Sequence, residues 1–75
     1  MFLFKTTEEL ESNLLKRIKE EREKMGLSQY ELAKRIGLGQ SAYQKIEKGK
    51  TRLDMFRFLK ITQALGVYPK DFFDN

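Results

Sequence analysis

Glycines divide this chain into short segments in which apolar residues recur at helical spacing. Four of the five glycines directly follow such a segment: Gly26, Gly37, Gly49 and Gly66. Glycine is common just beyond the last turn of a helix. Only one proline is present, and no stretch alternates apolar and polar residues as a half-buried strand does. The pattern predicts an all-α fold, and 75 residues are enough chain for a single domain over 1–75.

Capping residues place the starts of the expected helices. A capping box, in which a hydroxyl and a carboxylate three residues apart satisfy free backbone N–H groups, occurs twice. The first is Thr6 with Glu9, and the second is Ser28 with Glu31. Asp54 is the expected cap of a later helix. We therefore expect helices over 6–25, 29–36, 40–48 and 55–65, and a last short turn over 69–73.

The apolar residues of each expected helix share one side of its helical wheel and predict the core. The residues expected to face inward are Leu10, Leu14, Ile18, Met25, Leu32, Ala33, Ile36, Ala42, Tyr43, Ile46, Phe58, Leu59, Ile61, Thr62 and Leu65. Arg22 falls within the apolar arc of the first helix. A cation there needs either a partner or a route along the surface to water.

Cysteine and histidine are both absent from the sequence. Their absence removes the disulfide, the thiolate nucleophile, the commonest zinc ligand and the usual general base at neutral pH. We therefore expect no metal, no cofactor and no catalytic residues, and an enzyme is the most remote reading.

Positive charge is concentrated in the middle of the chain. Residues 34–60 carry eight basic and two acidic side chains, whereas the rest of the chain carries seven basic and nine acidic ones. A basic stretch in a small domain is typical of a polyanion partner, although many such stretches are only solvated surface.

The start of the chain carries no recognisable targeting signal. The apolar run over 1–4 breaks at Lys5, which is too short for a secretory signal, and no run approaches the roughly 20 apolar residues of a membrane span. We expect a cytoplasmic protein without a membrane partner, associated with the nucleoid when it is bound to DNA.

Residues 28–48 have the spacing of a helix-turn-helix. Apolar anchors surround the crossing of the two short helices, with a small residue, Ala33, where they approach and a turn glycine, Gly37, four residues later. Five segments closely match the phage-repressor helix-turn-helix family (Xre/Cro type, which includes the lambda and 434 repressors): 26–29, 31–33, 36–38, 46–50 and 64–67, with the sequences Gly-Leu-Ser-Gln, Glu-Leu-Ala, Ile-Gly-Leu, Ile-Glu-Lys-Gly-Lys and Ala-Leu-Gly-Val. The resemblance covers roughly residues 14–73 and implies a compact five-helix, lambda-repressor-like DNA-binding domain.

The resemblance also implies roles for individual residues. With the third helix in the major groove of DNA, the expected base contacts are Gln40, Ser41, Gln44 and Lys45. The expected phosphate contacts are Gln29, Lys48, Lys50, Arg52 and Arg57. Gln29 is further expected to support Gln40. Arg22 matches a family arginine that pairs with a glutamate near the end of the recognition helix, here Glu47. The alternative for the polar residues is that they are ordinary solvated surface.

Aromatic residues exceed what a minimal domain of this kind needs. The candidate dimer surface is Phe56, Tyr68, Phe72 and Phe73. A second apolar feature is the Phe2-Leu3-Phe4 segment within an N-terminal extension over 1–13, which includes the early turns of the first helix. These residues can simply cover a small core, but we expect a homodimer because related repressors commonly dimerise through the C-terminal end.

The leading functional hypothesis is a transcriptional regulator that binds double-stranded DNA in a sequence-specific way. In this hypothesis it is a dimeric repressor on a palindromic operator. The alternative is an interaction module such as an antitoxin, which sequesters a partner enzyme and regulates its own operon through the same fold.

Overall fold

The computed structural model describes residues 6–73, which form four α-helices and one short 3-10 helix. The helices are α1 (Thr7–Lys24), α2 (Gln29–Arg35), α3 (Gln40–Glu47) and α4 (Met55–Leu65), and the 3-10 helix is η1 (Pro69–Phe72). The prediction of an all-α fold is confirmed for these residues. The expectation of five helices needs a correction: the described residues form four α-helices, and the fifth element is a single 3-10 turn. Only four residues lie between Tyr68 and Phe73, which is too few for a longer helix.

Both capping boxes form as predicted. Thr6 accepts a hydrogen bond from the Glu9 backbone N–H at the start of α1, and Ser28 does the same for Glu31 at the start of α2. Asp54 accepts the Arg57 backbone N–H at the start of α4. These caps satisfy N–H groups that have no partner within the helix, so they fix where each helix begins.

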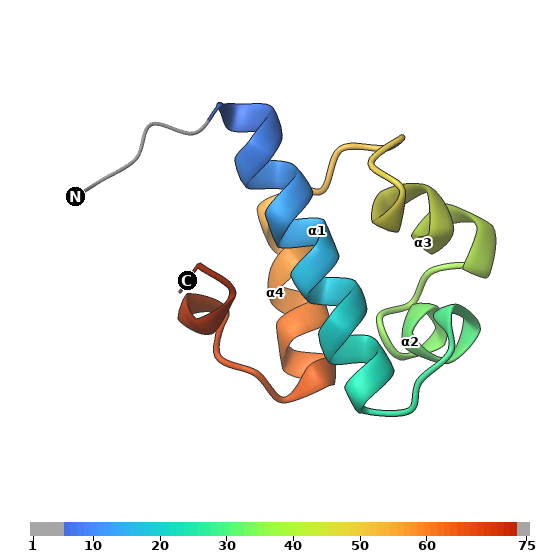
Figure 1. The fold of residues 1–75 in the computed structure, drawn as a ribbon. Helices are drawn as coiled ribbons and strands as arrows, with labels where there is room; N and C mark the ends of the chain where they lie inside the picture. The colour runs from blue at the N-terminus through green and yellow to red at the C-terminus, as the bar shows by residue number, and fades with distance from the viewer. Residues whose placement is uncertain (1–5, 74–75) are drawn as a thin grey trace.

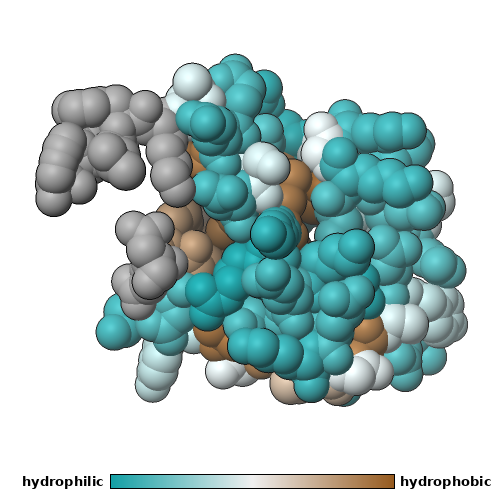
Figure 2. All heavy atoms as spheres, viewed as in Figure 1, coloured by the Kyte–Doolittle hydropathy of each residue, from teal (hydrophilic) through white to brown (hydrophobic). Residues whose placement is uncertain are grey.

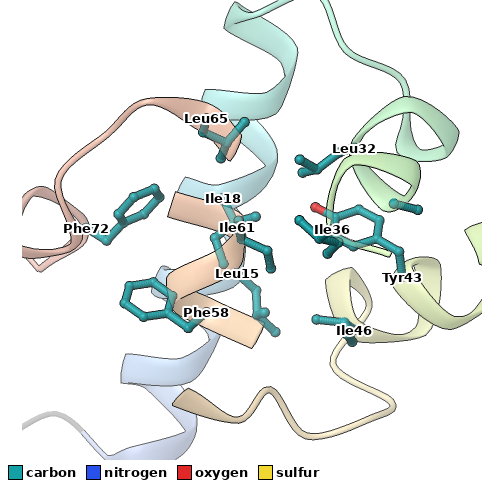
Figure 3. Close-up of a cluster of buried hydrophobic side chains, with 11 residues drawn as sticks. Leu15, Ile18, Leu32, Ile36, Tyr43, Ile46, Phe58, Ile61, Leu65 and Phe72 are labelled. Carbon is teal, nitrogen blue, oxygen red and sulfur yellow. The ribbon is translucent and has the colours of Figure 1, made fainter. Parts of the chain in front are cut away.

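The helices pack around one core in which α1 lies across α4, and α2 and α3 lie together at one side (Figure 1). The 3-10 helix η1 returns to pack against α1. Figure 3 shows side chains from all of these elements meeting in one cluster. The cluster comprises Leu15, Ile18, Leu32, Ala33, Ile36, Tyr43, Ile46, Phe58, Ile61, Leu65 and Phe72. Among residues 6–73, no helix combines the length and apolar content needed to cross a membrane.

Four residues expected to face inward are exposed: Leu10, Met25, Ala42 and Leu59. Leu10 is exposed because the first turns of α1 project beyond the other described helices, so that none of these helices covers them (Figure 1). The buried stripe of α1 follows Leu15, Ile18 and Arg22 instead. The expectations for the Phe2-Leu3-Phe4 segment lie outside the described residues.

Candidate nucleic-acid interface

The turn between α2 and α3 depends on Gly37. This residue has φ +76°, a conformation that side chains other than glycine rarely adopt. The Leu38 backbone N–H then donates to the Ala33 carbonyl at 2.9 Å and closes the end of α2. Ala33 and Leu32 are buried at the crossing of the two helices. The turn and the crossing together set the direction in which α3 leaves α2.

Two side chains anchor α3 to the core. Tyr43 is fully buried and Ile46 is 3% exposed, and both point from α3 into the cluster of Figure 3. The residues on the remaining sides of α3 are polar or small. Ser41 and Lys45 are exposed together with Gln40 and Lys48, while Gln44 is half-buried. The outer side of α3 is therefore a polar surface that the described chain leaves accessible.

Glu47, the last residue of α3, is a buried carboxylate shared by three helices. Its side chain is only 4% exposed, and that of its partner Arg22 is 9% exposed. Arg22 of α1 donates from Nε to Oε2 at 2.7 Å and from Nη2 to Oε1 at 3.3 Å. Gln29 of α2 donates to Oε1 at 3.0 Å. The structure thus brings Arg22 and Glu47 into the contact that the resemblance implies. We call Arg22, Gln29, Tyr43 and Glu47 the Glu47 cluster.

The third donor to Glu47 comes from its own helix. The Tyr43 hydroxyl donates to Oε2 at 2.6 Å, across the i, i+4 spacing that makes residues neighbours on a helix. This contact was missed in the sequence, where Tyr43 was assigned only to the core, although the spacing of Tyr43 and Glu47 could have shown it. Arg22 also donates from Nη1 to the Leu27 carbonyl at 2.7 Å. The cluster therefore ties α1, the start of α2 and the end of α3 together.

The cluster keeps Glu47 ionised. Burial alone raises the pKa of the Glu47 carboxyl, but the hydrogen bonds from Arg22, Tyr43 and Gln29 outweigh burial and leave the pKa below its ordinary value of 4.5. The Glu47 hydrogen bond raises the pKa of Arg22. Burial and the neighbouring carboxylate raise the pKa of the Tyr43 hydroxyl, so it stays protonated and remains a donor. A negative charge on α3 is thus neutralised inside the protein and kept off its outer side.

Cationic side chains flank α3 beyond its C-terminal end. Lys48, Lys50 and Arg52 are exposed in the segment that leads to α4. Arg57, in the first turn of α4, is half-buried and pairs with Asp54 at 3.0 Å. Figure 2 shows that hydrophilic residues cover most of the face over α2 and α3, with hydrophobic atoms in the recess beside α1. The start of α3 is also open, because Gly39 supplies no side chain to cap its N–H groups.

Among the expected contact residues, Ser41, Lys45 and Arg57 line one hollow, whereas Lys48 lines another beside α1. The contact made by Gln29 also differs from the expectation. The Gln29 amide contacts Glu47, whereas the resemblance implies contact with Gln40. The reason is that the hydrogen bond from Arg22 holds the Glu47 carboxylate beside the start of α2, where its Oε1 accepts from Gln29. One N–H of the Gln29 amide group stays available, since a primary amide carries two donors.

The candidate dimer surface needs one correction. Phe72 is 5% exposed and packs edge-on against the Phe58 ring at 5.6 Å, so it belongs to the core. Phe73 is 64% exposed, with its ring 5.8 Å from that of Phe58. Phe56 and Tyr68 are 67% and 73% exposed.

A groove runs beside Tyr68 on the outer side of α4, with Leu59 in its wall. Leu59 is 44% exposed and follows Phe56 by three residues, which places both on one side of the helix. We call Phe56, Leu59 and Tyr68 the α4 apolar face.

Comparison with known proteins identifies the family. A family model described as helix-turn-helix matches residues 18–72. The chain is 33% identical over 69 residues to an uncharacterized transcriptional regulator in the ATPase CF(0) region of Rhodospirillum rubrum, covering 92% of this chain and 63% of that protein. It is 37% identical over 60 residues to the uncharacterized HTH-type transcriptional regulator y4aM of Sinorhizobium fredii, covering 80% of this chain and 42% of that protein.

A solved structure agrees with these sequence relatives. The restriction-modification controller protein C.AhdI from Aeromonas hydrophila superposes with a TM-score of 0.76 at 31% identity, covering 83% of this chain and 94% of that one. The chain spans 63% and 42% of the lengths of the two curated relatives. The family model, the relatives and the shared fold together show that this chain belongs to the helix-turn-helix family of the phage-repressor (Xre/Cro) type.

Proposed function

We propose that this domain is a DNA-binding transcriptional regulator that inserts α3 into the major groove of double-stranded DNA. The observation that carries the proposal is the accessible polar side of α3, which two buried anchors, Tyr43 and Ile46, hold away from the core. The major groove of B-form DNA admits an α-helix, and base edges there differ for every base pair. Curated relatives named as transcriptional regulators support the same conclusion.

The polar residues of α3 would read base edges. Gln40 and Gln44 each carry a donor and an acceptor, which suit the N6 and N7 edge of adenine. Ser41 and Lys45 are exposed on the outer side, where a hydroxyl and an ammonium group meet acceptors of guanine or thymine. Because the Glu47 cluster ties three helices together, it would fix the angle at which these residues enter the groove.

Gln29 and the flanking cations would hold the phosphates on either side. Gln29 at the start of α2 and Arg57 in the first turn of α4 lie at helix N-termini, where N–H groups also favour anions. Lys48, Lys50 and Arg52 add charge without sequence information. Each phosphate neutralised in this way steepens the log–log salt dependence of binding by about 0.9.

The finer proposal is a homodimeric repressor on a palindromic operator. The α4 apolar face supports self-association, because its three large side chains are exposed, two of them lining a groove, and their exposure costs free energy until a partner covers them. Two copies related by a two-fold axis would place two α3 helices in successive major grooves, about 34 Å apart. A dimer bound over a promoter would exclude other proteins from it.

Selection of binding sites from random DNA duplexes tests the proposal. We expect a palindromic motif, and we expect Gln44→Ala to relax the preference at one position of each half-site. Lys50→Ala is the matched control, since it should weaken all duplexes alike and reduce the salt slope by about 0.9 per protomer. Failure of the wild-type protein to enrich any motif would refute the proposal. An unchanged motif for Gln44→Ala would refute the role of that residue alone.

A further inference from the structure

A hollow of about 520 Å³ lies between α3 and the segment that leads to α4. Its apolar wall includes Leu38, Ala42 and Ile46, and its polar wall includes Lys45, Thr51 and Arg57. The segment is folded back against α3, because the Lys50 and Thr51 backbone N–H groups both donate to the Lys45 carbonyl, at 2.9 and 3.3 Å. The hollow is therefore part of the folded framework of the helix-turn-helix.

Ala42 is the exposed apolar residue of this hollow. It lies between the exposed Ser41 and the buried Tyr43, on the flank of α3 that faces Arg57. Leu38 beside it is half-buried, and Ile46 behind it is buried. A methyl group at this position is presented to whatever occupies the hollow, with cations and a hydroxyl around it.

This lining suits an occupant that combines a small apolar group with negative charge nearby. Thymine in duplex DNA does so, because its C5 methyl group is the one apolar group on a base edge in the major groove. That methyl group projects from the outer part of the groove, close to the phosphates of its own strand. In the hollow, those phosphates would lie toward Arg57 and Thr51, while the methyl group meets Ala42 and Leu38.

We propose that Ala42 determines specificity by packing against the C5 methyl group of one thymine in each half-site. The proposal rests on the proposed function, since it takes α3 to lie in the major groove. It adds an apolar contact to a reading surface that otherwise uses hydrogen bonds. It also gives a role to a residue whose exposure the helical wheel did not predict.

Replacing thymine by deoxyuridine tests this contact, because it removes the methyl group and leaves every hydrogen-bonding group in place. The probe is the duplex selected by the wild-type protein from random DNA, with each thymine replaced in turn. For the wild-type protein we expect one thymine per half-site at which deoxyuridine weakens binding about fourfold, the effect of burying one methyl group. For Ala42→Gly we expect that ratio to fall to about one.

The ratio is measured within each protein, so any loss of helix stability caused by glycine cancels. Asn13→Gly, at an exposed position inside α1, is the matched control and should keep the wild-type ratio. The inference is overturned if no thymine is sensitive in the wild-type protein, or if Ala42→Gly retains the sensitivity. In both cases a selected motif would leave the proposed function standing. The absence of any motif would overturn both.

Discussion

Where α1, α2 and α3 meet, a buried carboxylate receives four hydrogen bonds, whereas on the outer side of α4 three large apolar side chains lie exposed. The first region is polar, yet its groups find hydrogen-bond partners within the chain. The second is apolar, and its side chains remain in contact with solvent. The contrast shows that polarity alone does not locate an interaction surface: the Glu47 cluster ties three helices together within the chain, and the α4 apolar face is the surface that we propose for a second copy.

The strongest test of this contrast is Arg22→Ala. It leaves the buried Glu47 carboxylate without its cation, so we expect a loss of about 3–5 kcal/mol in the free energy of unfolding, measured by urea denaturation. Arg57→Ala is the control, because it breaks a pair with Asp54 in which the two side chains are 42% and 53% exposed, and it should cost less than about 1 kcal/mol. A loss below about 0.5 kcal/mol for Arg22→Ala would show that the Glu47 cluster behaves as ordinary surface.

The pH dependence of the free energy of unfolding tests the Glu47 cluster again, with a smaller expected effect. The pKa of Glu47 is lowered in the folded protein, so its contribution is complete above the ordinary value of 4.5 and is lost as the pH falls through the folded value. At pH 7, Glu47→Gln should be less stable than the wild-type protein by about 1–3 kcal/mol, through loss of charge-assisted hydrogen bonds.

This difference should shrink below pH 4.5, because the wild-type carboxyl then becomes neutral too. Denaturation curves at pH 7, 5, 4 and 3 measure it. A difference that is constant with pH would contradict the assignment of an ionised, hydrogen-bonded Glu47.

The smallest effect on folding, and the clearest on assembly, is expected for Leu59→Ser in the α4 apolar face. Since Leu59 is 44% exposed, the free energy of unfolding of the monomer should fall by only about 1 kcal/mol. Sedimentation should show a shift from dimer to monomer. Leu10→Ser is the matched control, because Leu10 is also exposed but lies on α1. If both variants sediment as the wild-type protein does, the α4 apolar face is not the dimer surface.

Helix boundaries were predictable from the sequence because local residues decide them. The capping boxes at Thr6 and Ser28 and the glycine after α4 act within one or two turns of chain. Packing was less predictable, because it depends on what lies opposite. Leu10 and Leu59 satisfy the helical wheel, but no described element covers them. The helical wheel shows which residues share a side and does not show how far the partner helix extends.

The candidate site divides in a similar way. The exposed polar side of α3 follows from its sequence once Tyr43 and Ile46 are taken as anchors. The Arg22–Glu47 contact joins residues 25 positions apart, and the family resemblance implied it where spacing alone did not. The Tyr43–Glu47 contact was predictable from its i, i+4 spacing, whereas the Gln29 contact was not, because it depends on where Arg22 holds the Glu47 carboxylate.

The Glu47 cluster has a consequence for how such a domain can change its target. The side chains that fasten α3 to the rest of the molecule point one way, and those that face outward contribute none of the bonds that hold it. Outward residues such as Ser41 and Lys45 can therefore be exchanged while the scaffold stays the same. A few substitutions on the outer side would therefore change the DNA sequence that such a domain binds without changing its architecture.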